Sequence, residues 1–206
     1  MTLTSISILL LRHSFQRLFY DPNSSSSFNR YRIVHTHFDL RVDFDTHTLD
    51  GHVQLDLKSL NSESCDRSST ITNQDGHIPN DHGDQLILDA RNLNIKKVLL
   101  KSSDATLPFQ VNTSGESMTI DLGSTSSDAL TSVLIYYSTS STDCTALQWL
   151  TKEQTADRQH PYMFSQCQAI HARSLYPCQD TPGVKSTYSA RINCPKPLTV
   201  VMTTRS

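Results

Sequence analysis

The sequence lacks the short motifs that mark most catalytic and metal centres. Its 206 residues contain no His-Glu-x-x-His pair, no glycine-rich phosphate loop after a strand, no Cys-x-x-Cys pair and no Gly-x-Ser-x-Gly elbow. These motifs carry the zinc site of many metallopeptidases, nucleotide binding, thiol redox chemistry and hydrolysis by a serine nucleophile, respectively. The residues alone therefore predict a chain without a catalytic or metal-binding motif.

The sequence also has few charged residues of either sign, 18% in all. The sequence has 18 Lys and Arg against 20 Asp and Glu, a formal net charge of −2. Nucleic-acid-binding domains carry clustered basic residues, and membrane-surface segments carry basic runs. The apolar stretch Ile6–Leu11 is only six residues long, whereas a spanning helix needs about 20. We expect no nucleic-acid partner and no membrane partner.

Signals for export are weak. An odd number of cysteines, five in all, does not fit a secreted disulfide framework and favours reduced thiols. No Lys or Arg precedes Ile6, which argues against a secretory signal. We predict a cytoplasmic protein. The alternative is a mitochondrial presequence, because Arg12 and Arg17 lie in a segment without acidic residues before Asp21.

Apolar residues make up only 36% of the chain, which predicts long polar loops around a modest core. We expect residues 1–30 to form a flexible N-terminal tail and residues 31–206 to form one domain. Residues 59–85 are almost devoid of apolar side chains. A structureless stretch of that length is unusual within a compact domain, so we interpret it as a polar loop insertion.

Apolar and polar residues alternate in two neighbouring segments, Phe38–Phe44 and Val53–Leu57. Alternation of period two is typical of a strand with one wet face, and the turn between the segments predicts a β-hairpin. Further strand signals occur at 86–88, 95–100, 118–122, 133–137, 184–192 and 199–202. No helical stripe appears, so the prediction is an all-β fold, an antiparallel sandwich. No closing element precedes Ser206, so we expect the last strands of the sandwich to be missing.

Three groups of residues could carry chemistry, although a structural role is favoured for each. His35 and His37 share one face of a strand and could supply half of a metal site, but no further ligands are evident. His77 and His82 lie in the polar loop, which would not preorganise metal ligands. Cys167 and His171 could form a nucleophilic pair, but the sequence shows nothing that would activate the thiol.

Residues 146–190 are irregular and rich in aromatic and glutamine residues. Within them, the ALQWL sequence of residues 146–150 and HPYMFSQCQAIHARSLYPCQDTP of residues 160–182 resemble the leukotriene A-4 hydrolase branch of the peptidase M1 zinc aminopeptidases. The resemblance extends from Val34 to Met202. It implies that the chain is the saddle-like N-terminal β-domain of that family.

The resemblance also implies a role for three residues. The glutamines and alanine of the family's Gln-Cys-Gln-Ala motif fall on Gln166, Gln168 and Ala169, which makes these the candidate substrate-binding residues. The resemblance places Gln168 beside the free α-amino end of a peptide and leaves Gln166 as a support. A side-chain amide oxygen can accept a hydrogen bond from an ammonium group without adding a full charge. Asp180 is expected to cap neighbouring amides, and Trp149 and Tyr162 to pack this segment on the sheet.

The family's zinc helix and its peptide-binding strand have no counterpart in this sequence. The resemblance therefore implies a zinc-dependent removal of N-terminal residues from peptides only in a full-length enzyme, with an epoxide hydrolase activity left open. This chain is expected to hold no cofactor, to be inactive alone and to need a catalytic domain as its partner. The alternative is a stand-alone peptide-binding or interaction domain without catalysis.

Overall fold

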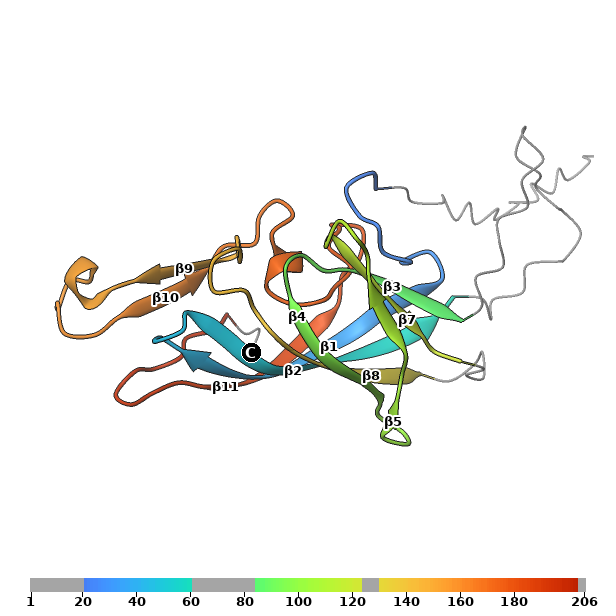
Figure 1. The fold of residues 1–206 in the computed structure, drawn as a ribbon, viewed down its shortest axis with the longest axis horizontal. Helices are drawn as coiled ribbons and strands as arrows, with labels where there is room; N and C mark the ends of the chain where they lie inside the picture. Colours follow the sequence, from blue (N-terminus) through green and yellow to red (C-terminus); the bar gives the residue numbers. More distant parts are fainter. Residues whose placement is uncertain (1–20, 61–83, 124–129, 204–206) are drawn as a thin grey trace, which may run out of the picture.

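The computed structural model describes residues 21–60, 84–123 and 130–203 of the chain (Figure 1). The strands are β1 (Tyr31–Asp43), β2 (Thr48–Ser59), β3 (Gln85–Asp89), β4 (Asn94–Leu100), β5 (Ala105–Thr106), β6 (Phe109–Val111), β7 (Ser117–Asp121), β8 (Thr131–Ser138), β9 (Leu147–Leu150), β10 (Tyr162–Ser165) and β11 (Thr187–Asn193). Two single 3-10 turns, η1 (Lys152–Gln154) and η2 (Ala172–Ser174), complete the regular structure. Within these ranges no helix is long and apolar enough to cross a membrane.

The predicted hairpin forms the centre of the larger sheet. β1 and β2 pair antiparallel from Tyr31↔Ser59 to Asp43↔Thr48, and the Asp43 carboxylate accepts hydrogen bonds from the two amides of the turn that follows it. Gly51 of β2 is required by a close approach, because a Cβ there would lie 2.1 Å from the backbone oxygen of Asp39.

The larger sheet has six strands in the order β11-β1-β2-β8-β4-β5. Its pairs are antiparallel except for β11, which runs parallel to β1 at the edge. The predicted all-β fold is confirmed. The parallel pair differs from the expected antiparallel arrangement, because the long connection between Asp43 and Thr187 lets β11 return in the same direction as β1.

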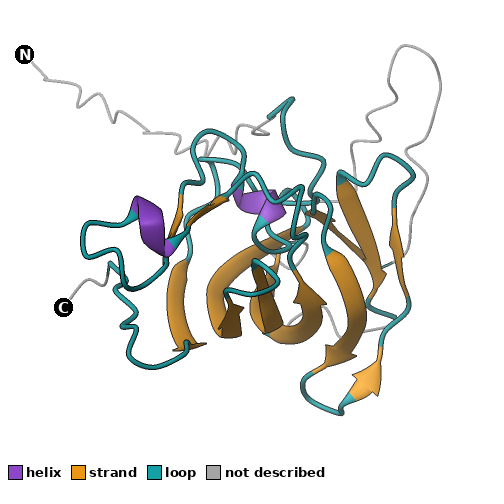
Figure 2. Ribbon diagram, turned by 60° about the vertical axis from the view of Figure 1, so that its left-hand side comes forward, coloured by secondary structure: helices purple, strands orange, loops and turns teal. Residues whose placement is uncertain are grey.

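A second sheet, β3-β7-β6, packs with the first around one core. The alternating residues of β2 (Val53, Leu55, Leu57), of β8 (Val133, Ile135, Tyr137), of β3 (Leu86, Leu88) and of β7 (Met118, Ile120) are all fully buried. Figure 2 shows the strands curving around this core, with the longer loops gathered at one end. Period-two burial from two layers is the signature of a sandwich.

The sequence did not predict a strand pair in residues 146–190, yet β9 and β10 form an antiparallel hairpin there, with Trp149 opposite Met163. In Figure 1 this hairpin projects beyond the body of the domain. The predicted strand over 184–192 is confirmed at Thr187–Asn193, whereas residues 199–202 form no strand.

The predicted division at residue 30 and the polar insertion stay predictions. The structure describes only the last third of the predicted tail, residues 21–30. There the amide of Ser27 donates to the backbone oxygen of Ile87, and Phe28 is buried. Residues 21–30 are therefore attached to β3. Most of the insertion, including His77 and His82, lies outside the described residues.

Candidate functional site

The three candidate site residues follow directly after β10. Gln166, Gln168 and Ala169 are all exposed. The Gln166 amide donates to the backbone oxygen of Ala146 at 2.8 Å, and its side-chain Oε1 accepts from the Gln168 amide at 3.4 Å. The Gln168 side chain makes no hydrogen bond to any described residue, so its amide group is free to meet a ligand. The Gln168–Ala169 peptide bond is cis.

Local hydrogen bonds fix the backbone of residues 166–169, the candidate loop, and of the residues that follow it. The His171 amide donates to the Cys167 oxygen at 3.0 Å, and the Ser174 amide donates to the His171 oxygen at 3.0 Å. The Ser174 hydroxyl is also within 3.0 Å of the Ala146 amide, which donates to it. These hydrogen bonds join the candidate loop to the start of β9, so the backbone that carries the exposed glutamines is held in place.

A buried ionic network anchors the same segment to the rest of the domain. The Arg173 Nε donates to Asp180 Oδ2 at 3.0 Å, and Arg173 Nη1 lies 3.9 Å from Asp89 Oδ1. Arg173 is 4% exposed and Asp89 is fully buried. Asp89 also accepts from the Ser24 hydroxyl at 2.6 Å and from the backbone amides of Ser25 and Asp180. Buried charges persist only when paired and hydrogen-bonded in this way.

The expected capping role of Asp180 agrees with this network, because its carboxylate accepts from the Arg173 backbone amide at 3.2 Å. Sequence reasoning missed Arg173 and Asp89. They are 84 residues apart in sequence (173 − 89), and no local pattern marks such a pair. Gln179 was missed as well: it binds the β1 backbone at Ile33 and Tyr31.

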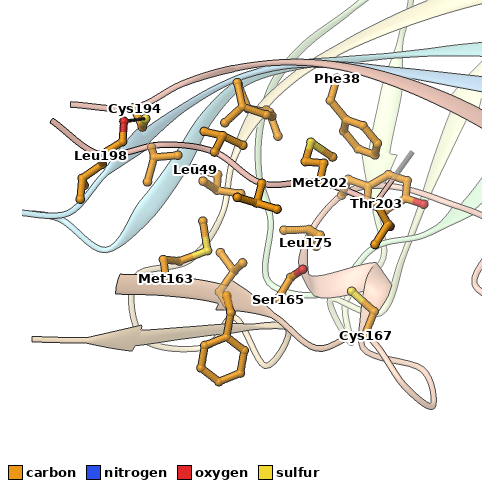
Figure 3. Close-up of a pocket in the computed structure, with 18 of the residues that line it drawn as sticks. Phe38, Leu49, Met163, Ser165, Cys167, Leu175, Cys194, Leu198, Met202 and Thr203 are labelled. Carbon is orange, nitrogen blue, oxygen red and sulfur yellow. Dashed lines mark hydrogen bonds between the residues drawn. The ribbon is translucent and has the colours of Figure 1, made fainter. Parts of the chain in front are cut away.

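An open apolar groove of about 780 Å³ lies beside the candidate loop (Figure 3). The inner face of the sheet supplies one wall, including Phe38 and Leu49, and the β9–β10 hairpin supplies Met163 from the opposite side. Ser165 and Cys167, which flank Gln166 in sequence, also line it. The candidate loop therefore stands at the rim of this groove.

The aromatic residues on the two faces of the hairpin have different contacts. Trp149 meets Phe44 edge to face, with ring centroids 5.3 Å apart, and stacks on His47 at 5.3 Å. Trp149 therefore packs on the sheet as expected. Tyr162 instead lies on the opposite face of the hairpin, is 55% exposed and stacks on Phe164. Residues in paired strands alternate between faces, so Tyr162 turns away from Trp149.

The described residues do not fit a zinc site. They contain no cluster of three or more His, Cys, Asp and Glu side chains placed to hold a metal ion. His35 and His37 both bond to the Ser189 hydroxyl at 2.8 Å, and His35 also reaches the Thr187 hydroxyl. Their role in the structure is to join β1 to β11.

The described cysteines are free thiols, at 144, 167, 178 and 194. Burial raises the pKa of the Cys167 thiol, and nearby Asp180 adds to the rise. The His171 ring nitrogen Nδ1 bonds to the Thr145 hydroxyl at 2.8 Å. A nucleophilic cysteine needs a lowered pKa and a base directed at its sulfur. The geometry gives the Cys167–His171 pair neither, and Cys65 lies outside the described residues.

Comparison with known proteins matches this architecture. The family model of the peptidase M1 N-terminal domain matches residues 28–205. The leukotriene A-4 hydrolase homolog of Botryotinia fuckeliana is 38% identical over 182 residues, covering 86% of this chain and 25% of that protein. Leukotriene A-4 hydrolase of Xenopus laevis is 37% identical, covering 88% of this chain and 27% of that protein.

A solved structure shows the same fold. Yeast LTA4 hydrolase superimposes with a TM-score of 0.71 at 33% identity, over 89% of this chain and 26% of that one. The chain thus spans about a quarter of the length of these relatives. Because the family model covers nearly the whole chain and the all-β fold agrees, the chain belongs to the peptidase M1 N-terminal domain family.

Proposed function

We propose that this chain serves as the substrate-facing N-terminal domain of a leukotriene A-4 hydrolase-like zinc aminopeptidase, which removes N-terminal residues from peptides. The proposal is supported by family membership and by similarity to proteins named leukotriene A-4 hydrolase and leucine aminopeptidase 2. An epoxide hydrolase activity, which the first of these names suggests, is left open. We propose the cytoplasm as its location, since five cysteines favour reduced thiols.

The single observation that supports a substrate role best is the exposed Gln168 side chain on a fixed loop. Its amide group is unbonded among the described residues, while the backbone around it is tied to Ala146 and to η2. A peptide's α-ammonium group donates hydrogen bonds, and the amide Oε1 of Gln168 accepts one without a full charge. Gln166 braces the loop by accepting a hydrogen bond from the Gln168 backbone amide, and Ala169 is included because it completes the Gln-Cys-Gln-Ala motif.

The zinc chemistry of such an enzyme would belong to a catalytic domain, because this sequence lacks a His-Glu-x-x-His motif and its described residues do not form a metal-binding group. We expect the 206-residue chain alone to release no product from aminoacyl amides. A catalytic domain would supply the metal, the base and the acidic partner for the α-amino group.

A chimaera of yeast LTA4 hydrolase, with its matched N-terminal quarter replaced by this chain, tests the proposal. Gln168→Ala should raise KM for an aminoacyl amide with an uncharged side chain by about 10- to 150-fold, because a hydrogen bond to the charged α-ammonium group is worth about 1.5–3 kcal/mol. The loss of a binding contact should leave kcat within about twofold. Steady-state kinetics of the zinc-loaded chimaera provide the measurement.

Gln110→Ala is the matched control, because Gln110 is an exposed glutamine on β6 that does not line the groove. It should leave both constants unchanged. An active chimaera in which Gln168→Ala and Gln110→Ala give the same KM would contradict the role of Gln168. An inactive, zinc-loaded chimaera together with micromolar peptide binding by the chain alone would favour the stand-alone binding domain.

A further inference from the structure

The outward face of β1 carries two histidines that the proposed function does not use. His35 and His37 are two positions apart, so both side chains lie on the same face of the sheet. Thr36 between them lies on the opposite face, where it lines the groove. Both histidines are half-buried, so the sheet supports their rings while one side of each ring still reaches solvent.

Two hydroxyl groups of β11 contact these rings. In the parallel register, His35 lies across from Thr187, and His37 lies across from Ser189. The Nδ1 atom of His35 lies 2.7 Å from Thr187 Oγ1, and its Nε2 atom lies 2.8 Å from Ser189 Oγ. The Nδ1 atom of His37 lies 2.8 Å from the same Ser189 oxygen. One nitrogen of each ring therefore converges on a single oxygen atom.

The hydrogen bonds select a tautomer of His35. The Thr187 hydroxyl donates to the backbone oxygen of Val34 at 3.3 Å, so the Thr187 oxygen accepts the proton of His35 Nδ1. The Nε2 atom of His35 then carries the lone pair and accepts from the Ser189 hydroxyl. Metal-binding histidines are oriented in this way, because an acceptor group holds the proton of the other ring nitrogen. His37 Nε2 has no hydrogen-bond partner among the described residues, so that ring can keep its proton there and present Nδ1 as a ligand.

The spacing of these atoms fits a metal ion with nitrogen and oxygen ligands. An imidazole nitrogen binds a metal ion at about 2.0–2.1 Å, so two ligands at right angles are about 2.8–3.0 Å apart. The Ser189 oxygen is 2.8 Å from each of the two nitrogens. Square-planar or tetragonal sites with nitrogen and oxygen ligands are typical of Cu²⁺ and Ni²⁺. Water fills the remaining positions, so such a site needs fewer protein ligands than a structural zinc site.

We propose that His35 Nε2 and His37 Nδ1, with the Ser189 hydroxyl beside them, bind a divalent transition-metal ion of the Cu²⁺ and Ni²⁺ class. The proposal does not depend on the proposed function, because all of these groups belong to β1 and β11 of this chain. Arg191, on the same part of the face, is paired with Asp39 at 3.3 Å, which reduces its repulsion of the ion. The ion would link β1 to β11 through side chains, so its binding should stabilise the folded chain.

Calorimetric titration of the 206-residue chain with Ni²⁺ tests the site, because Ni²⁺ does not oxidise the free thiols. The test variants are His35→Gln and His37→Asn. A Gln amide reaches about as far as Nε2 and an Asn amide about as far as Nδ1, so the hydrogen bonds to Ser189 can persist while the imidazole is lost. Thr187→Val removes only the group that orients His35 and should weaken Ni²⁺ binding by about 10–100-fold. Loss of either imidazole should weaken it by about 100-fold or more.

His160→Ala is the matched control, since His160 is a half-buried histidine bonded to one carboxylate, that of Asp157. It should leave the titration unchanged. Ni²⁺ should also raise the unfolding temperature of the unmodified chain and of the His160 variant, but not that of His35→Gln or His37→Asn. The inference is overturned if His35→Gln and His37→Asn bind Ni²⁺ as tightly as the unmodified chain does. An unmodified chain that binds no Ni²⁺ at millimolar concentration overturns it as well.

Discussion

At the scale of single residues, two Arg–Asp pairs contrast in their surroundings. Arg173 lies between Asp89 and Asp180, with side-chain exposures of 5%, 0% and 10%. Arg191 meets Asp39 at 3.3 Å across β11 and β1, but its side chain is 72% exposed. An exposed pair is weakened by solvent, whereas breaking a buried pair leaves a charge without compensation.

Arg173→Leu should therefore lower the free energy of unfolding by about 3–5 kcal/mol, because it leaves buried Asp89 without its cation. Arg191→Leu, the matched control, should cost about 1 kcal/mol or less. Urea unfolding of the 206-residue chain and of both variants supplies the comparison. Equal losses in the two variants would show that the Arg173 network adds nothing beyond an ordinary surface pair.

At the scale of the elements, the β9–β10 hairpin depends on Trp149. Its edge-to-face contact with Phe44 and its stack on His47 attach the hairpin to the β1–β2 turn. Trp149→Ala should loosen the hairpin while the six-stranded sheet persists. Hydrogen exchange should show backbone amides of Leu147–Leu150 and Tyr162–Ser165 exchanging about tenfold faster or more, with β2 and β8 unaffected.

Tyr162→Ala provides the comparison, since Tyr162 is on the other face of the same hairpin and more than half exposed. Its exchange rates should stay close to those of the unmodified chain. The attachment through Trp149 would be disproved if both variants exchanged alike.

The elements also show what a sequence can and cannot predict. β1, β2 and β8 were predictable because one face of each is buried, so apolar residues recur at every second position. β9 and β10 were not, because both of their faces carry large side chains, such as Trp149 and Phe164, and no alternation results. The partner of β11 was hidden because pairing between residues 152 positions apart leaves no trace in local sequence. The role proposed for Gln168 came only from a family resemblance, and a single exposed glutamine has no physical signature of its own.

At the scale of the whole molecule, titratable groups set a pH range of greatest stability. Burial lowers the pKa of His52 below its ordinary 6.5. Hydrogen bonds from Thr181 and from the Thr46 amide lower the pKa values of Asp21 and Asp43 below 3.8. A lowered pKa means that the unfolded chain binds more protons, so stability falls as the pH decreases below each ordinary value.

Burial acts in the opposite direction on the thiols of Cys144, Cys167 and Cys178, whose pKa values are raised above 9.0. The folded thiols keep their protons, so stability falls as the pH rises above 9.0. The free energy of unfolding, measured in urea at a series of pH values, should therefore be greatest between pH 6.5 and 9. His52→Gln should reduce the loss of unfolding free energy between pH 6.5 and 5 and leave the loss above pH 9 unchanged. An unchanged acid limb in that variant would remove His52 as its cause.

The parallel pairing of β1 with β11 has a consequence for synthesis on the ribosome. His35 lies 152 residues before its partner Thr187, and translation adds about 5–20 residues per second. One hydrogen-bonding edge of β1 therefore waits roughly 8–30 seconds for its neighbour, while the antiparallel hairpin with β2 closes early. During that interval the nascent chain presents an unpaired strand edge, the kind of surface that chaperones shield and that other nascent chains can pair with.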